Sequence, residues 1–98
     1  MIKEKYNKQT FEDIKHFNEY WEGRELQNIL EYTEWRNFKM VINKAKEACD
    51  KSNNKISDHF VELNKIVKTG AFERRMIDYK LSRYACYLIV QNGDSRKV

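Results

Sequence analysis

The feature that most restricts the fold is a set of apolar residues spaced like the turns of an α-helix. Five of them recur at alternating intervals of three and four residues: Trp35, Phe38, Ile42, Ala45 and Cys49. This spacing places all five on one face of a helix, because a helix turns once in about 3.6 residues. The pattern predicts an amphipathic helix over 34–49, capped by Thr33, with its apolar face in the core.

Shorter apolar patterns predict three more helices, over 11–17, 24–30 and 83–92. We expect Ser82 to cap the last of these and Gly93 to end it in the left-handed conformation. The helix over 83–92 is apolar on every side. It is therefore expected to be buried among the other elements, or against a second copy of the chain.

The segment at about residues 60–80 alternates in polarity and predicts a β-hairpin with its turn at 68–71. Three residues of its second strand are expected to face inward: Ile77, Tyr79 and Leu81. A helix at 72–81 remains the alternative, because four residues also share a helical face: Phe72, Met76, Tyr79 and Arg83. The expected fold is α+β: a mainly helical small domain with one β-hairpin, followed by a buried C-terminal helix.

The chain has 98 residues, the size of one small domain. Residues 1–9 are polar and expected to fray, residues 10–98 to form the domain, and the charged end at 94–98 to lead into a longer protein. No apolar stretch is long enough for a membrane span or a signal peptide, so we expect a cytoplasmic protein. Two cysteines, Cys49 and Cys86, are too few for a disulfide framework and fall on apolar faces.

The formal net charge of +4 lies entirely in residues 50–98. Six basic residues stand between positions 65 and 83 against two acidic ones. Such a cluster attracts phosphate backbones, although it is also typical of a solvated surface. The residues expected to contact nucleic acid are six cations and one aromatic residue at the hairpin tip: Lys65, Lys68, Arg74, Arg75, Lys80, Arg83 and Phe72.

Motifs of catalysis and metal binding are missing from the sequence. The chain contains no G-x-S-x-G, H-E-x-x-H, P-loop or G-x-G-x-x-G pattern. Its histidines and cysteines (His16, Cys49, His59 and Cys86) form no closely spaced pair of the kind that structural zinc requires. We therefore expect a protein that is no enzyme and uses no cofactor or metal.

Three segments carry a resemblance to a known family: residues 19–26 (EYWEGREL), 30–38 (LEYTEWRNF) and 78–94 (DYKLSRYACYLIVQNGD). With residues 58–62 (DHFVE) between them, the chain resembles the amino-terminal region of the DNA-damage-inducible protein D family. That region is similar to the BRO amino-terminal domain of viral and phage antirepressors. Family members tend to carry alanine where this chain has Gly23, and they extend well beyond position 98.

The resemblance implies a bacterial protein of the SOS response that binds DNA, single- or double-stranded, and that contacts the recombinase filament. It also implies that Arg24 and Arg36 are structural, since both adjoin aromatic residues. The alternative function is a protein-interaction module that docks on a recombinase filament or a repressor. The apolar last helix leaves a homo-oligomer open as well.

Overall fold

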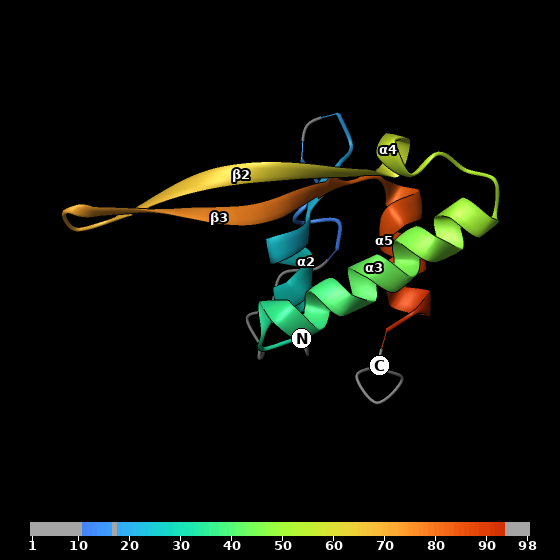
Figure 1. The fold of residues 1–98 in the computed structure, drawn as a ribbon, viewed down its shortest axis with the longest axis horizontal. Helices are drawn as coiled ribbons and strands as arrows, with labels where there is room; N and C mark the ends of the chain where they lie inside the picture. The colour runs from blue at the N-terminus through green and yellow to red at the C-terminus, as the bar shows by residue number, and fades with distance from the viewer. Residues whose placement is uncertain (1–10, 17, 94–98) are drawn as a thin grey trace.

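The computed structural model describes residues 11–16 and 18–93; predictions made for residues 1–10, 17 and 94–98 lie outside this part of the chain. The elements in chain order are β1 (Trp21–Glu22), α2 (Gly23–Ile29), α3 (Trp35–Lys51), α4 (Ile56–His59), β2 (Phe60–Thr69), β3 (Phe72–Leu81) and α5 (Arg83–Gln91). The three strands form one antiparallel sheet in the order β1-β3-β2 (Figure 1).

Strands β2 and β3 form a long hairpin that projects from the rest of the molecule (Figure 1). The pairing runs from Phe60 opposite Leu81 at the base to Thr69 opposite Phe72 at the tip. Gly70 has a φ of 62°, which suits the first position of a two-residue type II′ turn. The predicted hairpin is thus confirmed, with a turn shorter than 68–71, and the alternative helix at 72–81 is wrong.

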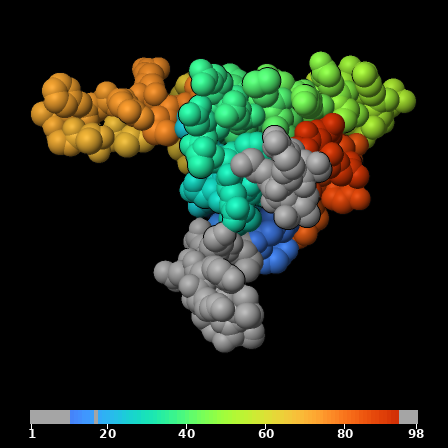
Figure 2. Space-filling model, turned by 90° about the horizontal axis from the view of Figure 1, so that it is seen from below, coloured from blue at the N-terminus to red at the C-terminus, as the bar shows by residue number. Residues whose placement is uncertain are grey.

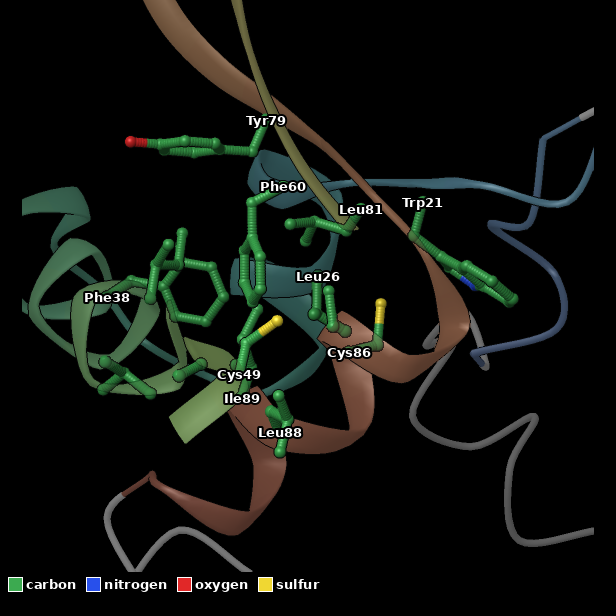
Figure 3. Packing of buried hydrophobic residues seen from close by; sticks show 14 of the residues in the cluster. Trp21, Leu26, Phe38, Cys49, Phe60, Tyr79, Leu81, Cys86, Leu88 and Ile89 are labelled. Atoms are coloured by element: carbon green, nitrogen blue, oxygen red, sulfur yellow. The ribbon is translucent and has the colours of Figure 1, made fainter. Parts of the chain in front are cut away.

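The hydrophobic core lies where the base of the hairpin meets α3 and α5 (Figure 3). Helix α3 buries four of the five predicted residues, Phe38, Ile42, Ala45 and Cys49, together with Val41, while Trp35 is half-buried. The predicted Thr33 cap is wrong, because Glu34 stands at the N-cap position and its side chain makes no capping hydrogen bond. Tyr79 and Leu81 of β3 are buried as predicted, while Ile77 is half-buried. The sheet therefore enters the core only at the base of the hairpin.

Helix α5 begins as predicted, because the Ser82 hydroxyl accepts a hydrogen bond from the Ala85 N–H. It does not end as predicted: Gly93 lacks the left-handed conformation, and the Asn92 side chain instead donates to the Leu88 carbonyl. Its burial also differs, since Tyr87 and Val90 are 61% and 57% exposed. The prediction that the other elements bury this helix on all sides is wrong, because one face of α5 packs on α3 and the other is exposed. Burial of the exposed face against a second copy stays a prediction.

The prediction of a mainly helical domain is also wrong. About 45% of the described residues are helical and 29% lie in strands or bridges. The strand fraction is large because the two hairpin strands have ten residues each.

The predicted helix over 11–17 is absent from the described residues: 11–14 form a turn, and His16 pairs with Tyr20 in a β-bridge. Asn18 and Glu19 turn the chain there with φ angles of 71° and 54°, which a helix excludes. No described helix is both long and apolar enough to cross a bilayer.

Candidate nucleic-acid interface

The outer part of the hairpin, residues 63–77, is called the arm. None of its residues is buried, whereas Asp78 and Tyr79 beside it are almost fully enclosed. Space-filling atoms in Figure 2 show the arm standing clear of the body. The predicted nucleic-acid contacts therefore lie on the arm, at its base and on α5, in different surroundings.

Lys65, on the arm, is held by carboxylates at the hairpin base. Its Nζ lies 2.5 Å from Glu22 Oε1 and 2.9 Å from Asp78 Oδ2. Partial burial works against the charged form, but the hydrogen bonds to these two carboxylates outweigh it and raise the pKa of Lys65. Lys65 thus joins β1 to β3 through an ion-pair network.

Asp78, the centre of this network, is fully buried. Its Oδ1 accepts hydrogen bonds from the backbone N–H groups of Arg24 and Tyr79, at 2.9 and 2.7 Å. A Cβ at Gly23 would lie 3.1 Å from the same oxygen, so glycine allows the start of α2 to approach the carboxylate closely. Sequence reasoning missed this role and counted Asp78 only as one acidic residue of the basic segment.

Arg83 is the second predicted cation with carboxylate partners. Its guanidinium reaches Glu19 at 3.2 Å and Glu12 at 3.5 Å, and the hydrogen bond to Glu19 is the main cause that raises the pKa of Arg83. The guanidinium also lies 5.1 Å from the centre of the Trp21 ring. Arg83 therefore ties the start of α5 to the segment before β1.

Lys68 and Lys80 lie at opposite ends of the hairpin. Lys68 is close to the tip, with its Nζ 3.9 Å from Glu73 across the strands. Lys80 lies at the base, with its Nζ 4.7 Å from the centre of the Tyr20 ring. Both lysines are exposed, so their charges face solvent.

Arg74 and Arg75 line an open groove between β3 and the first turns of α3, about 750 Å³ in volume. Ten residues line it: Arg24, Trp35, Arg36, Lys39, Met40, Asn43, Arg74, Arg75, Met76 and Ile77. Five of these are basic and none is acidic. This basic groove gathers positive charge from three elements, α2, α3 and β3. Only two of the six cations predicted from the sequence, Arg74 and Arg75, line it.

Arg24 fixes the geometry of the basic groove. Its guanidinium carbon lies 3.8 Å from the centre of the Trp35 ring, and its Nε donates to the Ile77 carbonyl at 3.0 Å. Burial lowers the pKa of Arg24, but an arginine side chain is always protonated at neutral pH, so the group stays charged. The structural role expected for Arg24 is confirmed, and its charge also lines the groove.

Arg36 and Lys39 are the basic groove residues contributed by α3. The Arg36 side chain is 82% exposed and lies 3.2 Å from Glu34, so the structural role expected for it is wrong. The two cations are three residues apart and share one side of the helix. That spacing was visible in the sequence, but their approach to β3 depends on tertiary packing.

Phe72 lies at the last paired position of the arm and is 75% exposed. Residues that alternate along a strand share one face, so Phe72 and Arg74 lie on the same side of the arm while Arg75 lies on the other. The exposed ring and a cation two residues away thus point in the same direction from the sheet.

One further group of ligand-type atoms comes together near β1. Single ligand atoms of His16, Glu22 and Glu25 lie within 4.8 Å of one another. Hydrogen bonds already engage them, because His16 Nε2 lies 2.7 Å from Glu25 Oε1 and Lys65 binds Glu22. The group is accounted for as part of the ion-pair network around the hairpin base.

The two cysteines are buried, at 0% exposure for Cys49 and 2% for Cys86. Burial raises the pKa of Cys49, and it raises the pKa of Cys86 to about 12. Both thiols are therefore protonated at neutral pH and pack as small apolar groups. Their predicted apolar positions are confirmed.

Comparison with known proteins gives two matches that agree with each other. Residues 9–98 match the model of the BRO family, N-terminal domain. The chain is 49% identical over 94 residues to DNA damage-inducible protein D of Escherichia coli (strain K12). The alignment covers 91% of this chain and 34% of the relative, so the chain spans about one third of that protein's length. No solved structure matches the chain.

Proposed function

Because this chain belongs to the BRO family, as an example of its N-terminal domain, we propose that it binds DNA as a non-catalytic component of the DNA-damage response. The similarity to DNA damage-inducible protein D supports the second part of this proposal. The basic groove and the arm beside it support the first part, since DNA is a densely charged polyanion.

The observation that carries the proposal is the composition of the basic groove. Five basic side chains line it without a carboxylate among the lining residues. Like charges brought this close raise the local positive potential and draw phosphates toward the site. Four of the five are arginines, whose planar guanidinium groups bind phosphate oxygens in pairs.

The cations of the hairpin and α5 then divide into two groups. Arg74 and Arg75 make the main phosphate contacts in this proposal, and the exposed Lys80 extends the contact toward the base of the hairpin. Lys68, near the tip, is exposed but lies 3.9 Å from Glu73, so it makes a smaller contribution. Lys65 and Arg83 would first have to leave their carboxylate partners. Their part in binding is therefore indirect, through the position of the hairpin and of α5.

A DNA titration with two matched variants tests the proposal. Arg74→Ala/Arg75→Ala removes two charges at the groove. Lys51→Ala/Lys55→Ala removes two exposed charges at the opposite end of α3, one from its last residue and one from the loop that follows (Figure 1). We expect the groove variant to bind a short DNA at least about tenfold more weakly, and the control to stay within about twofold of wild type. Equal losses in both variants would contradict a specific role for the groove.

The exposed face of α5 supports a second candidate function, docking on a recombinase filament or a repressor. Tyr87 and Val90 are exposed and line an apolar hollow of about 300 Å³ with Phe11, Arg83 and Cys86. Exposed apolar patches often mark protein interfaces. Capture of the filament or repressor that persists after nuclease treatment and in high salt, and that is lost in Tyr87→Ser, would favour this function. Light scattering of the free protein shows separately whether the face joins two copies.

A further inference from the structure

The shape of the arm points to a more specific mode of DNA binding than its positive charge alone does. Resting on the proposed DNA binding, we infer that the arm enters a groove of double-stranded DNA and that Phe72 inserts between two neighbouring base pairs and bends the duplex. The substrate is then duplex DNA, and Phe72 at the tip of the arm opens one base step.

The dimensions of the arm suit a duplex groove. Its two paired strands lie about 4.8 Å apart, and the segment 63–69 extends about 20 Å at roughly 3.4 Å per residue. A two-stranded ribbon of this kind fits a major groove about 12 Å wide and about 8.5 Å deep. The arm is therefore long enough for its tip to reach the base pairs while its base stays outside the groove.

Phe72 is placed as a wedge. It is the outermost paired residue of β3, and only the small residues Gly70 and Ala71 lie beyond it in the turn. The ring is 75% exposed, so the protein itself leaves most of its apolar surface uncovered. Proteins that kink DNA often insert an apolar side chain of this type between base steps.

The arm contains one aromatic residue, which favours duplex over single-stranded DNA. Between positions 63 and 77 the sequence reads LNKIVKTGAFERRMI, with Phe72 as its sole ring. Proteins that bind single strands usually stack several successive bases on several aromatic side chains. A single exposed ring at a narrow tip matches the opening of one base step instead.

Charges near the ring suit the two backbones of a duplex. Arg74 shares the face of Phe72, and Arg75 points to the opposite face. Cations on both faces can reach phosphates on both sides of a groove that the arm enters. Glu73 would repel phosphate, but it lies 3.9 Å from the Lys68 ammonium, which offsets its charge.

A wedge also needs a rigid support, and the base of the arm provides it. The ladder is paired along all ten residues of each strand. Arg24 binds the Ile77 carbonyl, and Lys65 joins the arm to Asp78 and Glu22. Force on the tip is thus passed to the body of the protein rather than taken up by a flexible loop.

The bend can be measured by fluorescence resonance energy transfer between dyes at the two ends of a duplex of about 25 base pairs, at saturating protein. We expect wild type and Phe72→Leu, which retains an apolar wedge, to shorten the distance between the ends. Phe72→Ala should bind about five- to tenfold more weakly and leave the duplex straight at saturation. Ile66→Ala, which removes an exposed apolar side chain from the other face of the arm, serves as the matched control and should bend DNA like wild type.

The outcomes separate the inference from the proposed function. If wild type and Phe72→Ala bind and bend the duplex equally, the wedge is wrong while DNA binding stands. If wild type shows no salt-dependent binding to either the duplex or the single strand, the proposed function and the wedge fail together. A Phe72→Trp variant adds a direct readout, because its new tryptophan lies at the tip of the arm. The tryptophan fluorescence that this variant has in excess of wild type should be quenched by duplex DNA. Quenching by single-stranded DNA alone would overturn the choice of duplex DNA as the substrate.

Discussion

The guanidinium of Arg24 covers the Trp35 ring, with 3.8 Å between its carbon and the centre of the ring. This contact joins the first turn of α2 to the first turn of α3. Because Arg24 also binds the Ile77 carbonyl, the same side chain holds the base of the arm. The shape of the basic groove therefore depends on one residue that three elements share.

Replacing Arg24 tests this shared contact. Arg24→Lys keeps the charge but loses the flat stack on Trp35 and the fixed Nε donor, so we expect it to lower the free energy of unfolding by about 1–2 kcal/mol. Arg36→Ala, in the same groove but with a largely exposed side chain, should change it by less than about 0.5 kcal/mol. Urea denaturation measures both, and equal stability of Arg24→Lys and wild type would show that the stack is dispensable.

Lys65→Met tests the ion-pair network beneath the arm. The substitution leaves the buried Asp78 carboxylate without its ammonium partner. Since the lysine is 38% exposed and partly screened by solvent, we expect a loss of about 1–3 kcal/mol rather than the larger cost of breaking a fully buried pair.

The pH dependence of that loss follows from the raised pKa of Lys65. A raised pKa in the folded state means that the pair contributes fully below the ordinary lysine value of 10.5 and is lost as the pH rises through the folded pKa. The stability difference between wild type and Lys65→Met should hold from neutral pH to about pH 10 and shrink above it. A difference that stays constant into strong alkali would argue against the pair as its source.

Gly70→Val tests the turn at the tip of the arm. A Cβ added at this position would meet no atom within 4 Å, so any cost comes from the φ of 62° and not from a clash. A β-branched residue at such a φ should destabilise the hairpin by about 1–2 kcal/mol, and Gly70→Asn by less. Faster amide exchange in the arm of the valine variant measures this loss; exchange like that of wild type would contradict the assigned turn.

Burial of the two cysteines predicts their reactivity. Both thiols have a raised pKa, to about 12 for Cys86. In the native protein near pH 8, we expect neither to react with a thiol reagent at the rate of a free cysteine, and both to react in denaturing urea. A fast-reacting thiol in the native state would place that cysteine outside the core.

Local periodicity was enough to predict α3 and the hairpin, because each carries its pattern within its own residues. Phe38, Ile42 and Cys49 mark a helix face whatever else surrounds them. The short strand β1 and helix α4 have two and four residues, too few to show a period. The turn through Asn18 and Glu19 has left-handed conformations that follow from the β-bridge beside it.

The site was less accessible to sequence reasoning than the fold. A count of charges between 65 and 83 treats every cation as free, yet Arg83 is paired with Glu12 and Glu19, which lie 71 and 64 positions away. The basic groove arises in the same way, because α3 and β3 meet only in three dimensions. Resemblance to the family identified the kind of protein, and the structure showed which cations stand together.

The salt dependence of DNA binding tests the central claim most directly. If the groove and arm neutralise about four phosphates, the logarithm of the wild-type affinity should fall against the logarithm of salt concentration with a slope of about −3 to −4. In Arg74→Ala/Arg75→Ala we expect a slope shallower by about two, and in Lys51→Ala/Lys55→Ala the wild-type slope. A groove variant that binds with the slope and affinity of wild type would contradict the account.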